Sequence, residues 1–260
     1  MNTPSPAASS GPESLYLDLM ERTLANAIYG ESALEARLRG LLQRIKHPYT
    51  ARRGAIAWPA RAHTMIGPKR LANLRSLAET TLREAIPGDY IETGVWRGGA
   101  CILMRAVLAA HGVTDRRVFV ADSFEGLPRP DGQLYPADRR DRLFRFEELA
   151  VSEAEVARNF EAYGLLDDQV VFVKGFFRDT LPALSGQRFA LIRLDGDMYE
   201  STMDALTSLY AGLSSGGFAI VDDYGGIKAC RKAVHDFLDR IGAAPTITPV
   251  DESCVWWRKD

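Results

Sequence analysis

The stretch 90–110 constrains the fold more than any other part of the chain. A short apolar run ends in Gly94, Gly98 and Gly99, and a segment rich in helix-forming residues follows at once. A strand that turns through glycines directly into a helix makes a site for a small molecule. Glycine lets a ligand approach the backbone, and the first turn of the helix offers free N–H groups. We therefore expect one ligand to bind at this turn.

Strands and helices alternate from this point to the C-terminus. The expected strands are nearly continuous apolar runs, as in a parallel sheet that is covered on both faces. They span 90–93, 117–122, 170–174, 189–195 and 218–222, and the helices span about 99–111, 152–163, 177–184, 200–213 and 227–241. Two further runs, 246–250 and 254–258, predict a closing hairpin of strands. The pattern predicts an α/β fold with a doubly wound, mostly parallel, seven-stranded sheet.

An N-terminal extension and two lids are expected around this sheet. Residues 1–12 are small and rich in Pro and Ser, which predicts a disordered tail. Residues 13–87 are predicted to hold helices at 13–29, 32–46 and 68–86, and residues 88–260 are predicted to form the core. The loop 48–66 and the insertion 123–151 are long and lack periodicity, which is typical of lids. The apolar faces of the N-terminal helices exceed what one sheet covers, so we expect a homodimer through them.

The composition is that of an ordinary soluble enzyme. The 260 residues are 46% hydrophobic and 25% charged, and the net charge is −2 (32 basic and 34 acidic residues), so neither a nucleic-acid nor a membrane partner is expected. Cys101, Cys230 and Cys254 lie far apart without a CxxC pair, which predicts free thiols in a reducing compartment. We see neither a membrane span nor a signal peptide, and expect a cytoplasmic enzyme.

Two carboxylates near the glycine turn limit the choice of ligand. Glu92 precedes the glycines, and Asp122 ends the second strand, where it can accept hydrogen bonds from a ribose. The glycine spacing differs from the G-x-G-x-x-G of dinucleotide sites, and Glu92 would repel a pyrophosphate. S-adenosylmethionine suits the site better, because it carries a sulfonium, an amino group and a ribose but no phosphate. A turn that serves only the fold and a dinucleotide-dependent oxidoreductase remain as alternatives.

Six carboxylates follow the strands at the edge of the sheet where open α/β folds bind ligands. They are Glu92, Asp122, Asp195, Asp197, Asp222 and Asp223. So much negative charge in one place requires a cation. Oxygen ligands without His or Cys select a hard ion, so Asp195, Asp222 and Asp223 predict a site for Mg²⁺, Mn²⁺ or Ca²⁺. Asp197 or Asp223 could instead cap the helix that follows it.

A metal beside a sulfonium indicates methylation of a hydroxyl oxygen. An alcohol is a poor nucleophile, but a bound metal lowers its pKa and a nearby carboxylate can take the proton. The metal also orients the oxygen toward the methyl group. A catechol-type O-methyltransferase, which methylates a phenol, would use the same groups and remains an alternative.

Long motifs across residues 13–258 resemble the macrocin O-methyltransferase family. They are HTMIGPKRL (63–71), IETGVWRGGACILMRAV (91–107), VADSFEGLP (120–128), YGLLDDQVVFVKGFFRDTLP (163–182), LDGDMYESTMDAL (194–206) and GGFAIVDDYGGIKACRKAVHDF (216–237). The resemblance implies a class I methyltransferase fold, S-adenosylmethionine and Mg²⁺, and a deoxysugar of a glycosylated macrolide or aminocoumarin antibiotic as acceptor. Within the family, the chain is most similar to members that methylate the 4-hydroxyl of noviose in novobiocin biosynthesis.

The resemblance also assigns roles by position. It places the metal ligands at Asp195, Asp222 and Asp223 and the general base at Asp197. It places cofactor contacts at Met65, Ile66, Glu92, Thr93, Gly94, Trp96, Arg97, Gly98, Asp122, Ser123, Gly175 and Phe176. Tyr49 and His63 are candidates for contact with the acceptor, and the lids correspond to 48–64 and 129–150. Some macrolide-sugar members carry a His in the second lid where this chain reads Leu-Phe-Arg (143–145), so no role for that His is expected here.

Overall fold

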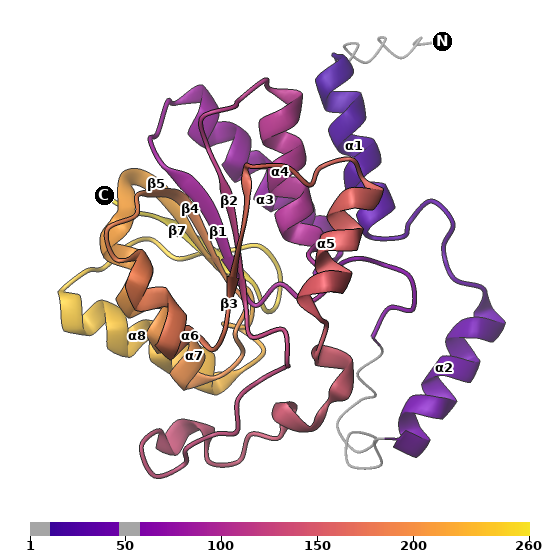
Figure 1. Ribbon diagram of the computed structural model, residues 1–260. Coiled ribbons are helices and arrows are strands. Elements are labelled where there is room, and N and C mark those ends of the chain that lie inside the picture. Colours follow the sequence, from indigo (N-terminus) through magenta and orange to yellow (C-terminus); the bar gives the residue numbers. More distant parts are fainter. Residues whose placement is uncertain (1–10, 47–57) are drawn as a thin grey trace, which may run out of the picture.

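The computed structural model describes residues 11–46 and 58–260. A seven-stranded sheet forms the middle layer, and helices cover both of its faces (Figure 1). The strands are β1 (Asp89–Thr93), β2 (Val118–Asp122), β3 (Val170–Lys174), β4 (Phe189–Leu194), β5 (Leu213–Val221), β6 (Thr248–Pro249) and β7 (Val255–Arg258). Their order is β3-β2-β1-β4-β5-β7-β6; the first five are parallel, and β7 runs antiparallel to both β5 and β6. The predicted doubly wound sheet and its closing hairpin are confirmed.

The helices divide between the two faces of the sheet. Their bounds are α1 (Pro12–Leu24), α2 (Ala33–Lys46), α3 (Gly67–Arg83), α4 (Gly99–Ala110), α5 (Glu153–Ala162), α6 (Phe177–Thr180), α7 (Tyr199–Leu209) and α8 (Lys228–Ile241). Helices α1, α3, α4 and α5 share one apolar cluster with the sheet, and α7 and α8 share the other. Alternate strand residues enter opposite clusters, as Tyr90 and Ile91 do in β1. None of the helices in the described ranges is long and apolar enough to cross a membrane.

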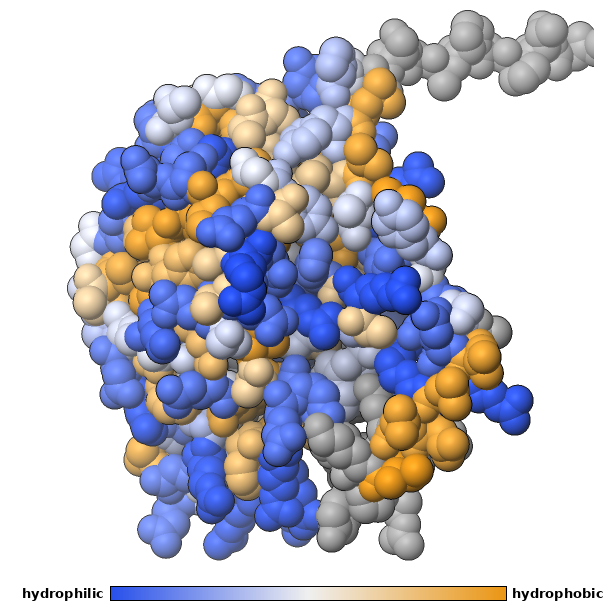
Figure 2. Space-filling view, turned by 45° about the vertical axis from the view of Figure 1, so that its right-hand side comes forward, coloured by the Kyte–Doolittle hydropathy of each residue, from blue (hydrophilic) through white to orange (hydrophobic). Residues whose placement is uncertain are grey.

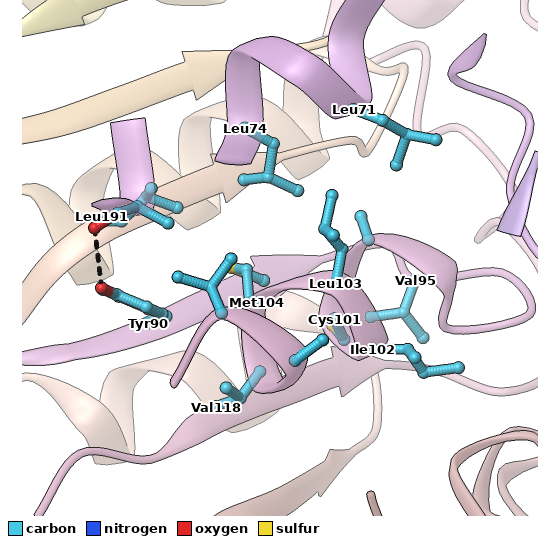
Figure 3. Packing of buried hydrophobic residues seen from close by; sticks show 14 of the residues in the cluster. Leu71, Leu74, Tyr90, Val95, Cys101, Ile102, Leu103, Met104, Val118 and Leu191 are labelled. Atoms are coloured by element: carbon cyan, nitrogen blue, oxygen red, sulfur yellow. Dashed lines mark hydrogen bonds between the residues drawn. The ribbon is translucent and has the colours of Figure 1, made fainter. Parts of the chain in front are cut away.

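The N-terminal extension packs on the sheet through α3 and α4. Leu71 and Leu74 of α3 point toward Leu103 and Met104 of α4 (Figure 3), and all four are buried. Burying each such side chain contributes roughly 2 kcal/mol. The hydroxyl of Tyr90 in β1 donates to a carbonyl oxygen of α3 at 3.1 Å, so the polar end of that buried ring is also satisfied. These contacts hold the helices that precede the glycine turn rigidly against it.

Helix α2 stands apart from this core, and its first turn is stabilised locally. The Ser32 hydroxyl accepts from the backbone N–H of Glu35 at 3.2 Å, and the Glu35 carboxylate accepts from the backbone N–H of Ser32 at 2.9 Å. This reciprocal capping box satisfies two free N–H groups. The helix therefore begins where its sequence specifies, although its apolar side chains find little cover.

Four predicted boundaries are wrong. The first helix ends at Leu24 rather than near residue 29, because Asn26 adopts a left-handed conformation with φ of 53°. The helix predicted to reach residue 213 ends at Leu209, and β5 begins at Leu213 rather than Phe218, because Leu213 already pairs with β4. The predicted tail reaches into α1 at Pro12. Residues 1–10 of the tail, and residues 48–57 of the first lid with Tyr49, lie outside the described residues.

The insertion between β2 and α5 is irregular along most of its length. It contains three short 3₁₀ turns, η1 (Pro136–Asp138), η2 (Leu143–Arg145) and η3 (Glu147–Leu149). Figure 1 shows this segment running beyond the ends of the strands, below the sheet in that view. We refer to residues 123–151 as the second lid.

Candidate active site

The site lies where the order of the parallel strands reverses. Strands β1 and β4 are neighbours in the sheet, and the chain leaves them toward opposite faces. The backbone N–H of Asp195, just after β4, donates to the carbonyl oxygen of Thr93 at the end of β1 (2.9 Å). Such a switch point opens a crevice at the carboxyl ends of the strands. The glycine turn and the acidic loop after β4 therefore meet at one place.

Two glycines of the turn are required by the protein's own backbone. A Cβ on Gly94, whose φ is +87°, would lie 1.8 Å from the carbonyl oxygen of Asp195. A Cβ on Gly99 would lie 2.4 Å from the carbonyl oxygen of His63. The expectation that these glycines make room for a ligand therefore misses their main role. They let the end of β4 and the segment before α3 close onto the turn.

A cleft opens beside the turn. Six residues predicted from the sequence line it: Gly94, Asp122, Ser123, Phe176, Asp195 and Asp197. The lining also includes Phe177 and residues that the sequence did not single out, namely Gly126, Leu127, Pro128 and Leu149 of the second lid and Arg178, Gly196, Glu200, Ser201 and Asp204. The structure thus brings the predicted cofactor side and the predicted acidic side together in one cleft.

Asp122 stabilises the turn from the end of β2. One carboxylate oxygen accepts from the backbone N–H of Val95 at 2.8 Å, and the other accepts from that of Phe124 at 2.7 Å. Burial raises the pKa of Asp122, and these N–H groups act against the rise. The carboxylate is therefore held in place before any ligand arrives. It lines the cleft, where a carboxylate oxygen can accept further hydrogen bonds.

A buried arginine lies among the carboxylates. Arg193 of β4 is 1% exposed, and its guanidinium donates to Glu92, to Asp195 (2.8 Å) and to Asp222. The cation that the acidic edge requires is thus supplied in part by the protein itself. The sequence contained a signal for it, because Arg193 interrupts an otherwise apolar strand, but a cation supplied by the protein itself was not predicted.

Glu92 lies beneath the turn. It is 2% exposed, pairs with Arg193 and accepts from the Cys101 thiol at 2.9 Å. Burial raises the pKa of Glu92 to about 7, although Arg193 opposes the rise. The predicted contact between Glu92 and a cationic cofactor stays a prediction, since Glu92 pairs with Arg193 and does not line the cleft.

Arg70 adds a second cation at the same edge. Its Nε donates to Asp251 at 2.7 Å, and another of its nitrogens donates to Asp222. Sequence reasoning missed both Arg70 and Asp251, because 181 residues separate them and only folding brings them together. Both oxygens of Asp222 are therefore engaged by arginines, one by Arg70 and one by Arg193.

The cluster of Asp195, Asp222 and Asp223 has the chemistry of a divalent-cation site. One carboxylate oxygen from each lies within 4.8 Å of the others. An all-oxygen set of this kind fits Mg²⁺ or Mn²⁺. Burial raises the pKa of Asp222 to about 6 and that of Asp223 well above its ordinary range, with neighbouring aspartates adding to the rise. A divalent cation would relieve this repulsion.

Asp197 occupies a strained position beside this cluster. Its φ is +60°, which is uncommon for a residue with a side chain. Its backbone N–H donates to Asp223 at 3.3 Å. Burial raises the pKa of Asp197 well above its ordinary range, and Asp195 and Asp141 raise it further. The suggested capping role is not seen, since the N-cap residue of α7 is Met198.

Several predicted cofactor residues support the turn and do not line the cleft. The Arg97 guanidinium donates to the carbonyl oxygens of Pro59, Ala60 and Ala62, and the Trp96 indole donates to that of Glu148 (2.8 Å). These contacts attach both lid segments to the turn. Met65, Ile66, Thr93, Gly98 and Gly175 also lie outside the cleft lining.

His63, a candidate for acceptor contact, is held by other parts of the protein. Its Nδ1 lies 2.8 Å from the hydroxyl of Tyr163 after α5, and its backbone carbonyl accepts from Gly99 at 2.9 Å. Burial, followed by the charge of Arg97, lowers the pKa of His63. His63 is not part of the cleft lining.

Comparison with known proteins identifies close relatives along nearly the whole chain. Residues 13–259 match the family model described as Macrocin-O-methyltransferase (TylF). The chain is 49% identical over 254 residues to mycinamicin III 3''-O-methyltransferase of Micromonospora griseorubida (96% of this chain, 98% of that protein). It is 51% identical over 245 residues to 8-demethyl-8-(2,3-dimethoxy-alpha-L-rhamnosyl)-tetracenomycin-C 4'-O-methyltransferase of Streptomyces olivaceus (94% and 92%).

A solved structure agrees with this relationship. The O-methyltransferase NovP superposes with a TM-score of 0.84 at 45% identity. The alignment covers 95% of this chain and 99% of that one. The sheet and its helices thus have the same arrangement in both proteins. A curated relative, the demethyldecarbamoylnovobiocin O-methyltransferase of Streptomyces niveus, is also 45% identical, over 257 residues (96% of this chain, 95% of that protein).

Proposed function

The chain belongs to the macrocin O-methyltransferase family and is an S-adenosylmethionine-dependent O-methyltransferase; from this premise we propose that it methylates a deoxysugar hydroxyl of a glycosylated antibiotic with the help of Mg²⁺. One observation supports the proposal most strongly. A single cleft joins Gly94, Asp122 and Phe176 to Asp195, which is one of the possible metal ligands, and to Asp197, whose backbone N–H donates to another of them, Asp223. Family membership leaves no support for the dinucleotide-dependent alternative.

The donor side of the cleft would hold the cofactor. Asp122 and Ser123 line it near the glycine turn, and the Phe176 ring follows β3, where an aromatic can stack on adenine. Asp195, Asp222 and Asp223 would hold Mg²⁺. When bound, S-adenosylmethionine supplies the methyl group and Mg²⁺ lowers the pKa of the acceptor hydroxyl.

Asp197 would take the proton from that hydroxyl at its carboxylate. It lines the cleft, and burial together with Asp195 raises its affinity for a proton. Leu127, Pro128 and Leu149 of the second lid would exclude water from this face of the cleft. Arg193 would hold Asp195 and Asp222 in place, because it pairs with both from inside the sheet.

We propose the 4-hydroxyl of noviose as the acceptor position. The similarity to NovP supports it. The relative of 51% identity acts on a 4' position of a rhamnosyl sugar, and the relative of 49% identity acts at a 3'' position. The relatives therefore support two different sugar positions, the 4-hydroxyl and the 3-hydroxyl, and the acceptor assay must distinguish between them.

The test is a mass-spectrometric assay with S-adenosylmethionine, Mg²⁺ and four acceptors. They are a novobiocin precursor with a free noviose 4-hydroxyl, the rhamnosyl-tetracenomycin acceptor, mycinamicin III and catechol. We expect one methyl group on the sugar of at least one glycoside, with the noviose glycoside turned over fastest. Methylation of catechol alone would overturn the proposed acceptor class in favour of a phenol.

We also propose a homodimer that forms through α1 and α2. Five apolar side chains of α2 are each more than half exposed: Leu34, Leu38, Leu41, Leu42 and Ile45. Figure 2 shows apolar surface gathered in a stripe along this helix. Two of the five, Leu38 and Leu42, border a hollow between α2 and residues 59–62. A second copy would cover this stripe, because exposed apolar surface of this extent marks an interaction site. The three buried, unpaired cysteines support the proposal of a cytoplasmic location.

A further inference from the structure

Helix α7 lacks a local cap at its first turn. It begins two residues after Asp197, and its first N–H groups need acceptors from outside the helix. The N-cap residue is Met198, which has no side-chain oxygen and makes no capping hydrogen bond. The segment between Asp197 and α7 therefore cannot satisfy these groups itself.

Asp138 of the second lid supplies the missing acceptor. Its Oδ1 accepts from the backbone N–H of Tyr199 at 2.8 Å, and its Oδ2 accepts from that of Glu200 at 2.9 Å. The Asp138 side chain is 1% exposed. Burial raises its pKa, and the two N–H groups act against that rise. A carboxylate located 61 residues upstream of Tyr199 thus caps the helix that follows the acidic loop.

The same part of the lid makes further contacts with α7 and with the site. The rings of Tyr135 and Tyr199 pack with their centroids 6.0 Å apart. The backbone N–H of Asp141 donates to the carbonyl oxygen of Asp138 at 2.8 Å, and the charge of Asp141 acts on Asp197. Leu127 and Leu149, nearer the two ends of the lid, line the cleft. The lid is thus fastened to α7 in its middle while its ends border the cleft.

The position of Asp197 depends on this first turn. Asp197 has φ of +60°, and such a conformation persists only when the surrounding structure enforces it. Its next neighbour, Met198, is fully buried, and the capped residues Tyr199 and Glu200 follow directly. Loosening the first turn of α7 would therefore release Asp197 from one side.

We propose that Asp138 is a positioning residue that couples docking of the second lid to the placement of Asp197. The proposal rests on the proposed function, since it takes Asp197 as the group that receives the proton. Asp138 does not line the cleft and acts only through α7. Its loss should lower the rate of methyl transfer and leave cofactor binding unchanged.

The variants are Asp138→Asn, which keeps one acceptor oxygen, and Asp138→Ala, which keeps none. Asp131→Ala is the matched control, because Asp131 also accepts two backbone N–H groups (2.9 and 3.0 Å), but from Gln133 and Leu134 within the lid. Hydrogen–deuterium exchange is measured on the full-length protein. We expect faster exchange in residues 134–142 and 199–203 for both Asp138 variants, least for Asn, and wild-type exchange at 199–203 for the control.

Kinetics and calorimetry complete the test. We expect kcat with a glycoside acceptor to fall about 10- to 100-fold in Asp138→Ala, less in Asp138→Asn, and not in the control. The Kd for S-adenosylmethionine should change less than about twofold, which general damage to the fold would not permit. Wild-type exchange at 199–203 in Asp138→Ala, or faster exchange there without loss of kcat, would overturn the coupling.

The two proposals fail in different ways. A wild-type enzyme that methylates no glycoside overturns the proposed acceptor class, while the exchange experiment still reads whether Asp138 holds the lid on α7. If Asp138→Ala does not fold, Asp138→Asn carries both measurements, because it preserves the size of the side chain.

Discussion

The carbonyl oxygen of Asp195 lies so close to Gly94 that a Cβ on Gly94 would stand 1.8 Å from it. Gly94 belongs to the turn after β1, and Asp195 opens the acidic loop after β4. The two halves of the site are therefore in direct backbone contact, with no side chain between them. Any displacement of one half must move the other.

Substitution Gly94→Ala should destabilise the folded protein by roughly 3 kcal/mol or more, because a methyl group at φ of +87° adds backbone strain to the clash with Asp195. Gly112→Ala is the control, since Gly112 also has positive φ (+63°) but a Cβ there meets nothing within 4 Å. It should cost only about 1–2 kcal/mol. Urea unfolding measures both, and equal losses would show that the contact with Asp195 is unimportant.

Substitution Asp197→Asn should abolish most turnover and preserve cofactor binding. Losing a proton acceptor that lines the cleft lowers kcat by about 10²- to 10⁴-fold. The Kd for S-adenosylmethionine, measured by calorimetry, should change little. Asp168→Asn, on the exposed loop before β3, is the matched control and should keep full activity. Retained turnover in Asp197→Asn would rule out its role as base.

Removal of divalent cations should inactivate the enzyme reversibly. Dialysis against EDTA should abolish methyl transfer, and added Mg²⁺ should restore it, because Asp195, Asp222 and Asp223 offer one oxygen-only cluster. Calorimetric titration with Mg²⁺ should show a binding site that Asp223→Asn loses. Full activity after dialysis, with no heat of Mg²⁺ binding, would exclude the metal site.

The pair of Arg70 and Asp251 should make stability depend on pH in the acid range. Burial acts to raise the pKa of Asp251, but hydrogen bonds from Arg70 and from the backbone N–H groups of Cys254 and Ser253 outweigh it and lower the pKa to about 2. The unfolded chain has a pKa near 4 at this carboxyl. Ionised Asp251 therefore stabilises the folded state above about pH 4, and this contribution disappears as the pH falls toward 2.

Asp251→Asn should accordingly lower the free energy of unfolding by about 1–2 kcal/mol at pH 7. Urea unfolding at pH 7, 4 and 3 compares the variant with the wild type, and the difference should be nearly halved at pH 3. Asp239→Asn, an exposed position on α8, should make no difference at any of these values. A gap for Asp251→Asn that stays constant with pH would contradict the pairing.

Charges on the apolar stripe of α2 should disrupt the proposed dimer. In a double variant, Leu38→Glu and Leu42→Glu place two carboxylates on the apolar stripe, where they would have to be buried unpaired on association. Light scattering coupled to gel filtration should then report a monomer at concentrations where the wild type is dimeric. Leu166→Glu, at an exposed apolar position before β3, is the control. A wild type that remains monomeric at every concentration would exclude the dimer.

Strand and helix periodicity predicted the sheet well, since the signal for each element is local. The start of β5, which was predicted wrongly, depends on a neighbour elsewhere in the chain. Leu213 belongs to β5 only because it pairs with β4, and no pattern in residues 210–217 predicts that pairing. The candidate residues at the strand ends were predictable for the same reason, because parallel strands in such folds end at one edge.

The partners of those residues were not predictable. The need for a cation followed from the six carboxylates, but the structure supplies Arg193 and Arg70, and Arg70 lies 152 residues from Asp222 in the chain. Asp138 caps α7, but the sequence around Met198 shows only that a local capping residue is missing. It does not show which distant residue replaces it. Long-range pairs of this kind arise from the register of distant segments.

The sequence by itself determined the fold class, the glycine turn after the first strand, and the acidic residues at the ends of β1, β2, β4 and β5. These follow from side-chain periodicity and backbone freedom, which act over a few residues. Only the tertiary structure decided that residue 94 must leave room for the carbonyl oxygen of Asp195, that Arg193 pairs with Glu92, and that the second lid caps α7. The physical reason is that burial and hydrogen-bond geometry depend on which distant segments the folded sheet brings into contact.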